Sequence, residues 1–152
     1  MSDDLNELYQ EVILDHSKSP HNFHKLEGAN RVAEGHNPLC GDNVAIYLLM
    51  EDDIIKNISF QGSGCAISKA SASLLTDSLQ GKSKAQAEEL FGKVHDMVTT
   101  GRVNGAEVGK LTVFSGVHKF PARVKCAILP WHAVVAAMEG KTEPVTTESE
   151  NP

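Results

Sequence analysis

The chain has 152 residues, of which 41% are hydrophobic and 22% are charged, and its formal net charge is −6. These values are ordinary for one globular domain, and the acidic excess argues against a nucleic-acid partner, because phosphates attract basic surfaces. No apolar run reaches the roughly 20 residues of a membrane span, and the acidic start is unlike a secretory signal. We therefore expect a cytoplasmic protein that binds neither membrane nor nucleic acid.

The first third of the chain predicts a helix followed by strands. Hydrophobic side chains recur at helical spacing near the N-terminus and predict a helix that ends near Ser17. A polar, irregular segment follows, with a short strand expected near residues 31–33. Two apolar runs at 44–50 and 54–60 flank a short acidic turn, which predicts a β-hairpin.

The middle of the chain predicts two helices. Small and apolar residues from 66 to 80 favour a helix that can pack closely against a sheet. Residues 83–86 have the spacing of a capping box and predict the start of a second helix, which Gly101 would end.

The last third is less regular in its pattern. Residues 101–120 contain four glycines and predict a long connection, with one helical turn near 111–114. Pro130 is expected to restart a helix rather than lie inside one, because proline lacks the N–H that a helix interior needs. Residues 1–140 are assigned to one domain, and residues 141–152 to a disordered acidic tail.

The three cysteines each lie at the boundary of a predicted element. Cys40 and Asp42 flank Gly41 in a loop before a strand, and a positive φ at Gly41 would let both side chains face one point. Cys65 follows a glycine-rich turn, and Cys126 begins a helical segment. In a reducing compartment three cysteines indicate metal or redox chemistry before disulfides, although three small buried thiols would give the same spacing.

Three thiolates and one carboxylate would complete a tetrahedral zinc shell. Asp42 is the hardest donor of this set, so zinc should hold it least tightly. Backbone N–H groups at the start of the helix after Cys65 would stabilise the negative charge of such a site. Of the histidines, His36 is near enough to Cys40 in sequence to be an outside candidate ligand.

Three motifs carry a resemblance to a known family. They are Asn-Pro-Leu-Cys-Gly-Asp at 37–42, Gly-Ser-Gly-Cys-Ala-Ile-Ser-Lys-Ala-Ser at 62–71 and Phe-Pro-Ala-Arg-Val-Lys-Cys at 120–126. Together they resemble the SufU branch of the IscU/NifU-N-terminal-like family, over nearly the whole chain. The segment 101–119 favours this branch, as does Lys125, which stands where IscU-type scaffolds carry a histidine ligand.

The resemblance implies a single α+β domain, with a small antiparallel sheet of about three strands backed by helices. It implies zinc bound by Cys40, Asp42, Cys65 and Cys126, with Arg123 near this site as a second catalytic residue besides Cys40. It also implies a SufS-type cysteine desulfurase as partner, which delivers persulfide sulfur to Cys40 for transfer to downstream Suf cluster-assembly proteins. Such a sulfurtransferase turns over only with its partner, so whether it counts as an enzyme is partly convention.

Zinc would keep the Cys40 thiolate unreactive until a docked partner supplies a replacement ligand, after which the thiolate can attack the persulfide. Two alternatives use the same ligands. The protein could be a scaffold that assembles a [2Fe–2S] cluster, since thiolates bind iron as well as zinc. It could also be an adaptor whose zinc is only structural.

Overall fold

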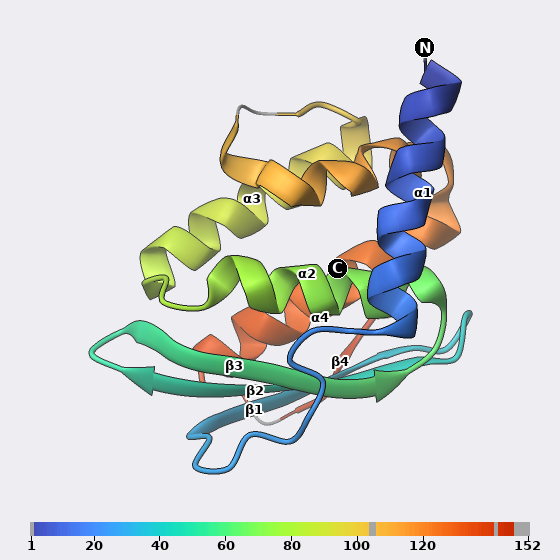
Figure 1. Ribbon diagram of the computed structural model, residues 1–152. Helices are drawn as coiled ribbons and strands as arrows, with labels where there is room; N and C mark the ends of the chain where they lie inside the picture. The colour runs from blue at the N-terminus through green and yellow to red at the C-terminus, as the bar shows by residue number, and fades with distance from the viewer. Residues whose placement is uncertain (1, 104–105, 142, 148–152) are drawn as a thin grey trace.

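The computed structural model describes residues 2–103, 106–141 and 143–147. The fold is α+β, as predicted, with one sheet and helices on one of its faces (Figure 1). The elements in chain order are α1 (Ser2–Lys18), β1 (Arg31–Asn37), β2 (Asp42–Glu51), β3 (Ile54–Ser63), α2 (Ala66–Leu79), α3 (Lys84–Thr100), the 3-10 helix η1 (Ala106–Lys119), α4 (Pro121–Met138) and β4 (Val145–Thr146).

The sheet has four strands in the order β3-β2-β1-β4. The first three are antiparallel as predicted, and β1 pairs with β2 so that Asn37 lies opposite Asp42. The sheet has one strand more than the expected number of about three, because β4 adds a parallel strand beside β1. This strand lies in the segment 141–152 that was expected to be disordered, of which residues 142 and 148–152 are outside the described part of the chain.

The helices form two tiers over the sheet. α2 and α4 pack directly on it, and α3 and η1 lie on their far side, while α1 runs along the edge of this assembly beside α2 (Figure 1). The inward face of β2 carries the buried side chains of Val44, Ile46 and Leu48. α2 presents small buried residues such as Ala70 and Ala72, which let it approach its neighbours closely.

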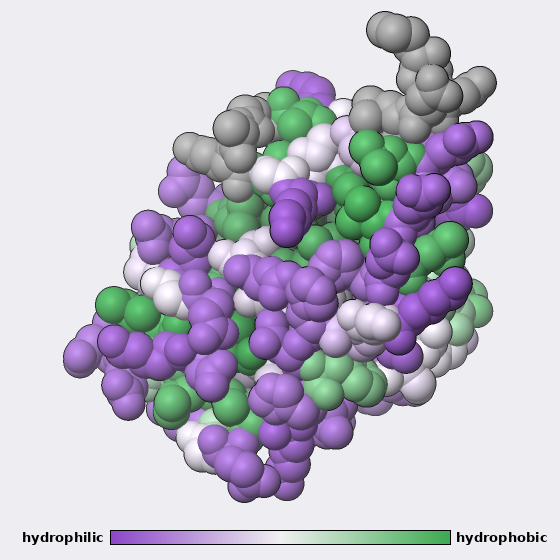
Figure 2. All heavy atoms as spheres, viewed as in Figure 1, coloured by the Kyte–Doolittle hydropathy of each residue, from purple (hydrophilic) through white to green (hydrophobic). Residues whose placement is uncertain are grey.

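Hydrophilic side chains predominate on the face shown in Figure 2, and the hydrophobic residues there form several separate areas. No helix within the described ranges is both long and apolar enough to cross a membrane.

Two local predictions are confirmed in detail. Ser83 and Gln86 form the capping box of α3, because each side chain accepts a hydrogen bond from the other's backbone N–H, and Gly101 ends the helix with φ of 84°. The hairpin β2–β3 turns through Asp52 and Asp53, both of which adopt positive φ.

Two predictions about the C-terminal third are wrong. The segment expected to be a long connection with one helical turn forms η1, which is kinked at Gly109. Pro130 lies inside the continuous helix α4 rather than restarting one. An interior proline displaces nearby carbonyls from the helical hydrogen-bond pattern, and here the buried Ser71 hydroxyl donates to the carbonyl of Ala127 over 2.6 Å.

Candidate functional site

Three elements bring the cysteines together. Cys40 lies in the turn between β1 and β2, Cys65 is the N-cap of α2, and Cys126 lies in the second turn of α4. Gly41 has φ of 69°, the conformation expected of it, and allows the tight turn between Cys40 and Asp42. The four predicted ligands thus come from segments that are far apart in the sequence.

The closest group consists of Cys40, Asp42 and Cys126, whose sulfur and carboxylate oxygen atoms all lie within 4.8 Å of one another. The sulfur atoms of Cys40 and Cys126 are 3.3 Å apart. Cys40 is exposed, Cys65 is half-buried and Cys126 is buried. Of the three thiols, Cys40 is therefore the most accessible to a partner protein.

Asp42 connects this group to Cys65. The buried carboxylate accepts a hydrogen bond from the Cys65 backbone N–H at 2.7 Å, and its other oxygen lies 3.8 Å from the Cys65 sulfur. Gly64 makes the approach possible, because a Cβ there would lie 2.2 Å from Asp42 Oδ1. A carboxylate that accepts backbone hydrogen bonds is held in one orientation, as a ligand must be.

The sulfur of Cys65 acts as the helix N-cap and accepts a hydrogen bond from the Ser68 N–H at 3.4 Å. Hydrogen bonding from the Cys126 thiol, with a smaller contribution from Ser68, lowers the pKa of Cys65 to about 7 against the opposing effect of burial. The pKa of Cys126 is raised, because its thiol is hydrogen-bonded to Cys65 and is buried. A backbone N–H at the start of α2 thus donates to the Cys65 sulfur, the kind of stabilisation that the sequence predicted for a thiolate at this position.

Asn37 is the residue whose role the sequence did not reveal. Its buried side-chain amide donates to Asp42 Oδ2 at 3.2 Å and to the Cys126 sulfur at 3.4 Å. Its carbonyl oxygen accepts a hydrogen bond from the Thr147 hydroxyl at 3.0 Å. Asn37 thereby connects two predicted ligands to the residue just after β4. In the sequence, the only sign of this role is that Asn37 begins the motif 37–42, which contains Cys40 and Asp42.

Two further candidates make other contacts. The exposed Arg123 lies in the first turn of α4, and its guanidinium carbon is 4.5 Å from the centre of the Phe120 ring. His36 contacts Asn43 through its ring at 2.6 Å, on the exposed side of the β1–β2 pair. His36 is therefore placed for a surface contact rather than for the cysteine group.

The donor set fits a zinc ion. Thiolates and a carboxylate are the ligands of tetrahedral zinc sites, and one side of this group is open at Cys40. Outer contacts from Asn37 and from backbone N–H groups orient the donors, as they do around metal sites. The assignment of individual ligands remains a prediction.

Comparison with known proteins identifies the family. Residues 8–138 match the family described as the NifU-like N terminal domain. The chain belongs to this family. It is 42% identical over 137 residues to the iron-sulfur cluster assembly scaffold protein IscU of Streptococcus pyogenes serotype M1, covering 89% of this chain and 85% of the relative. It is 37% identical over 147 residues to the zinc-dependent sulfurtransferase SufU of Bacillus subtilis, covering 90% and 95%.

A solved structure has the same fold. The N-terminal part of a NifU-like protein from Brucella abortus superposes with a TM-score of 0.81 at 21% identity, over 90% of this chain and 95% of that one. The family resemblance drawn from the three cysteine motifs is confirmed. The NifU-like family includes relatives with both scaffold and sulfurtransferase names, so family membership alone does not distinguish the two functions.

Proposed function

We propose that this member of the NifU-like family is a zinc-dependent sulfurtransferase that serves iron–sulfur cluster assembly. Zinc would be held by Cys40, Asp42, Cys65 and Cys126. The observation that carries the proposal is the group of Cys40, Asp42 and Cys126 within 4.8 Å, with the one exposed thiol of the chain at its rim. The name of the Bacillus subtilis relative, a zinc-dependent sulfurtransferase, supports the same chemistry.

When bound, zinc would supply the positive charge that keeps these thiols deprotonated at neutral pH. Cys40 then acts as the sulfur acceptor. Its thiolate attacks the outer sulfur of a persulfide on a SufS-type cysteine desulfurase, so that one S–S bond forms on Cys40 and the partner's S–S bond breaks. The partner leaves as a thiolate, and no external oxidant is needed.

The surroundings of Cys40 suit a docked protein partner. Leu39, which precedes it, is 66% exposed and offers an apolar contact beside the thiol. We assign Arg123 the role of attracting the anionic persulfide, since it is an exposed cation one helical turn before Cys126. The reaction would take place in the cytoplasm, where thiols stay reduced, and downstream Suf proteins would receive the sulfur.

Mass spectrometry tests the transfer. The protein is incubated with a SufS-type desulfurase and cysteine, and a mass gain of one sulfur is mapped to a peptide. We expect it on Cys40 of the wild type and nowhere in Cys40→Ser, and we expect Arg123→Gln to be slower. Lys56, an exposed lysine near the start of β3, is the control, and Lys56→Gln should leave the transfer unchanged. Persulfide forming first on Cys65 or Cys126, with Cys40→Ser still active, would contradict the assignment.

A second function is favoured by the name of the Streptococcus pyogenes relative, a cluster assembly scaffold. The same thiolates could bind a [2Fe–2S] cluster, because cysteine sulfur binds iron clusters as well as zinc. Anaerobic reconstitution with iron and sulfide separates the two. A chromophore that survives desalting, with iron bound in stoichiometric amount, supports the scaffold. Loss of the chromophore and the iron on desalting supports the sulfurtransferase.

A further inference from the structure

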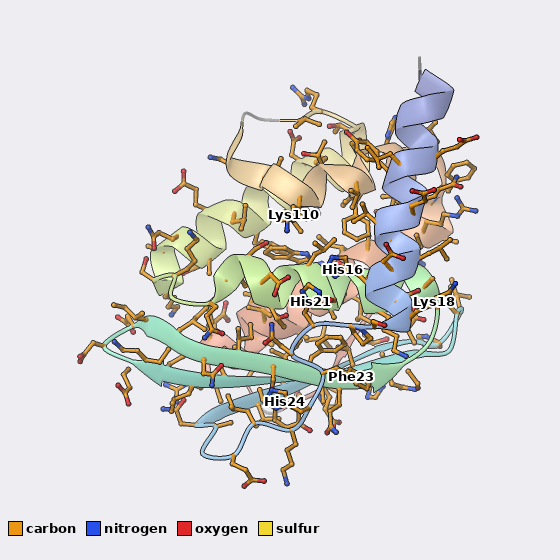
Figure 3. All side chains as sticks on the ribbon, viewed as in Figure 1. His16, Lys18, His21, Phe23, His24 and Lys110 are labelled. Carbon is orange, nitrogen blue, oxygen red and sulfur yellow. The ribbon has the colours of Figure 1, made fainter. Side chains whose placement is uncertain are left out.

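A second group of potential ligands lies at the opposite end of α2 from Cys65. His16 comes from the last turn of α1 and His21 from the loop that follows (Figure 3). Asp77 comes from the last turn of α2. One nitrogen of each imidazole and one carboxylate oxygen all lie within 4.8 Å of one another. Asp77 is about 18 Å along the helix axis from Cys65, so the two groups are separate sites.

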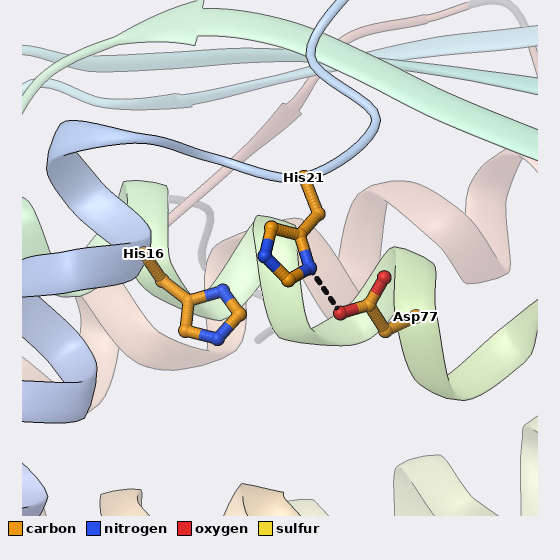
Figure 4. Close-up of side chains that lie close together, drawn as sticks. All are labelled: His16, His21 and Asp77. Atoms are coloured by element: carbon orange, nitrogen blue, oxygen red, sulfur yellow. Dashed lines mark hydrogen bonds and ion pairs between the residues drawn. The ribbon is translucent and has the colours of Figure 1, made fainter.

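Hydrogen bonds hold this histidine–aspartate group in place. His21 Nδ1 lies 2.5 Å from Asp77 Oδ2, with the His21 ring pointing toward the carboxylate (Figure 4). The buried Ser73 hydroxyl contacts His16 Nδ1 at 2.7 Å and accepts a hydrogen bond from the backbone N–H of His21 at 2.8 Å. Asn22 donates to the other oxygen of Asp77 at 3.3 Å. Three segments are thus tied together around the two rings.

His16 and His21 line an open pocket of about 450 Å³, together with Asp15 and Lys110. The side chains of His21 and Asp77 are 51% and 36% exposed, so an ion from solution can reach them. Asp15 at the pocket and Asp77 beside the His21 ring carry two negative charges, against the one positive charge of Lys110. Burial, followed by the nearby His21, lowers the pKa of His16, and neutral imidazole is the form that binds metals.

We propose that His16, His21 and Asp77 bind a divalent transition-metal ion independently of the cysteine group. Two imidazoles and a carboxylate suit Zn²⁺, Ni²⁺ or Cu²⁺, and the remaining coordination positions face the pocket and can hold water. The ion takes the place of the proton between His21 and Asp77. Their donor atoms then move apart to roughly 3.3 Å, because each stands about 2 Å from the metal.

Nickel titration of the full chain, loaded beforehand with one equivalent of zinc for the cysteine group and freed of excess zinc, tests this site. We expect paramagnetic Ni²⁺ to broaden the amide NMR signals of His16, His21 and Asp77 before those around Cys40, and to raise the melting temperature. His21→Gln should weaken nickel binding at least tenfold while its backbone bond to Ser73 stays. Asp77→Asn, which keeps the size of the side chain, should do the same.

Two control variants sharpen the result. His24→Gln changes an exposed histidine nearby whose ring contacts the backbone of Lys25, and should leave nickel binding unchanged. Lys110→Gln removes the opposing positive charge and should tighten binding several-fold at low salt. Broadening only around Cys40, or equal affinity in wild type and His21→Gln, would overturn the proposal whether or not the cysteine group transfers sulfur.

Discussion

The side-chain amide of Asn37 lies 3.4 Å from the sulfur of Cys126, although 89 positions separate the two residues in the chain. The same nitrogen also donates to Asp42. A buried amide that contacts two predicted ligands fixes how far apart they stand, so it sets the geometry that any metal would meet.

Asn37→Ala should therefore weaken both folding and zinc binding. The loss of a buried donor leaves Asp42 and Cys126 with unmet acceptors, which costs about 1–3 kcal/mol of unfolding free energy. Zinc affinity should fall roughly 10–100-fold. Denaturant titration and competition with a colorimetric chelator measure the two effects.

The control for this variant is Asn43→Ala. Asn43 is exposed and its side chain contacts His36 rather than the cysteine group. If Asn37→Ala and Asn43→Ala lower zinc affinity equally, the orienting role of Asn37 is wrong.

Gly64 has to be glycine, because its φ is 137° and an added Cβ would meet the Asp42 carboxylate. Gly64→Ala should push Asp42 away from the Cys65 N–H and cost about 1–3 kcal/mol in unfolding free energy. Gly92→Ala is the matched control, since a Cβ there finds nothing within 4 Å in the interior of α3. It should stabilise the protein by about 0.5–1 kcal/mol, so thermal unfolding of the two variants should shift in opposite directions.

Features fixed by local signals could be predicted from the sequence. The capping box at Ser83 and the terminating Gly101 define α3 through contacts within a few residues, so its bounds agree with the structure. The turn at Gly41 is a second example, because its positive φ follows from the lack of a side chain.

Features that depend on distant partners could not be predicted. Pro130 lies inside α4. In the turn before it, the carbonyl of Ala127 accepts a hydrogen bond from the Ser71 hydroxyl of α2, a contact between distant parts of the chain. Likewise β4 exists because it pairs with β1, and its two residues carry no strand pattern of their own. The amide contacts of Asn37 are a third example. Cys126 is 89 positions away in the chain, so nothing in the sequence around Asn37 indicates that the two residues touch.

Asp42 and Cys126 should contribute differently to zinc binding and to folding. Asp42→Ala should lower zinc affinity less than Cys126→Ala, because sulfur is the better donor to zinc. Asp42→Ala also leaves the Cys65 N–H without its acceptor, which costs about 1–3 kcal/mol in the metal-free protein. Chelator competition ranks the affinities, and denaturation in the presence of chelator isolates the folding term. Asp42→Ala as the weaker zinc binder of the two would contradict this ranking.

His132 makes folding sensitive to acid. Burial, followed by the charge of His95, lowers the pKa of His132 below its ordinary value of 6.5. The unfolded chain therefore binds a proton more readily than the folded one, so this contribution to stability is complete above pH 6.5 and is lost as the pH falls through the lower folded pKa.

His132→Gln should flatten the fall of unfolding free energy between pH 7 and 5.5, although the loss of its ring contact with Phe91 lowers stability at every pH. His24→Gln, at an exposed position, should keep the wild-type slope. Denaturant titrations at fixed zinc content measure the three slopes, and an unchanged slope in His132→Gln would show that another group carries the acid sensitivity.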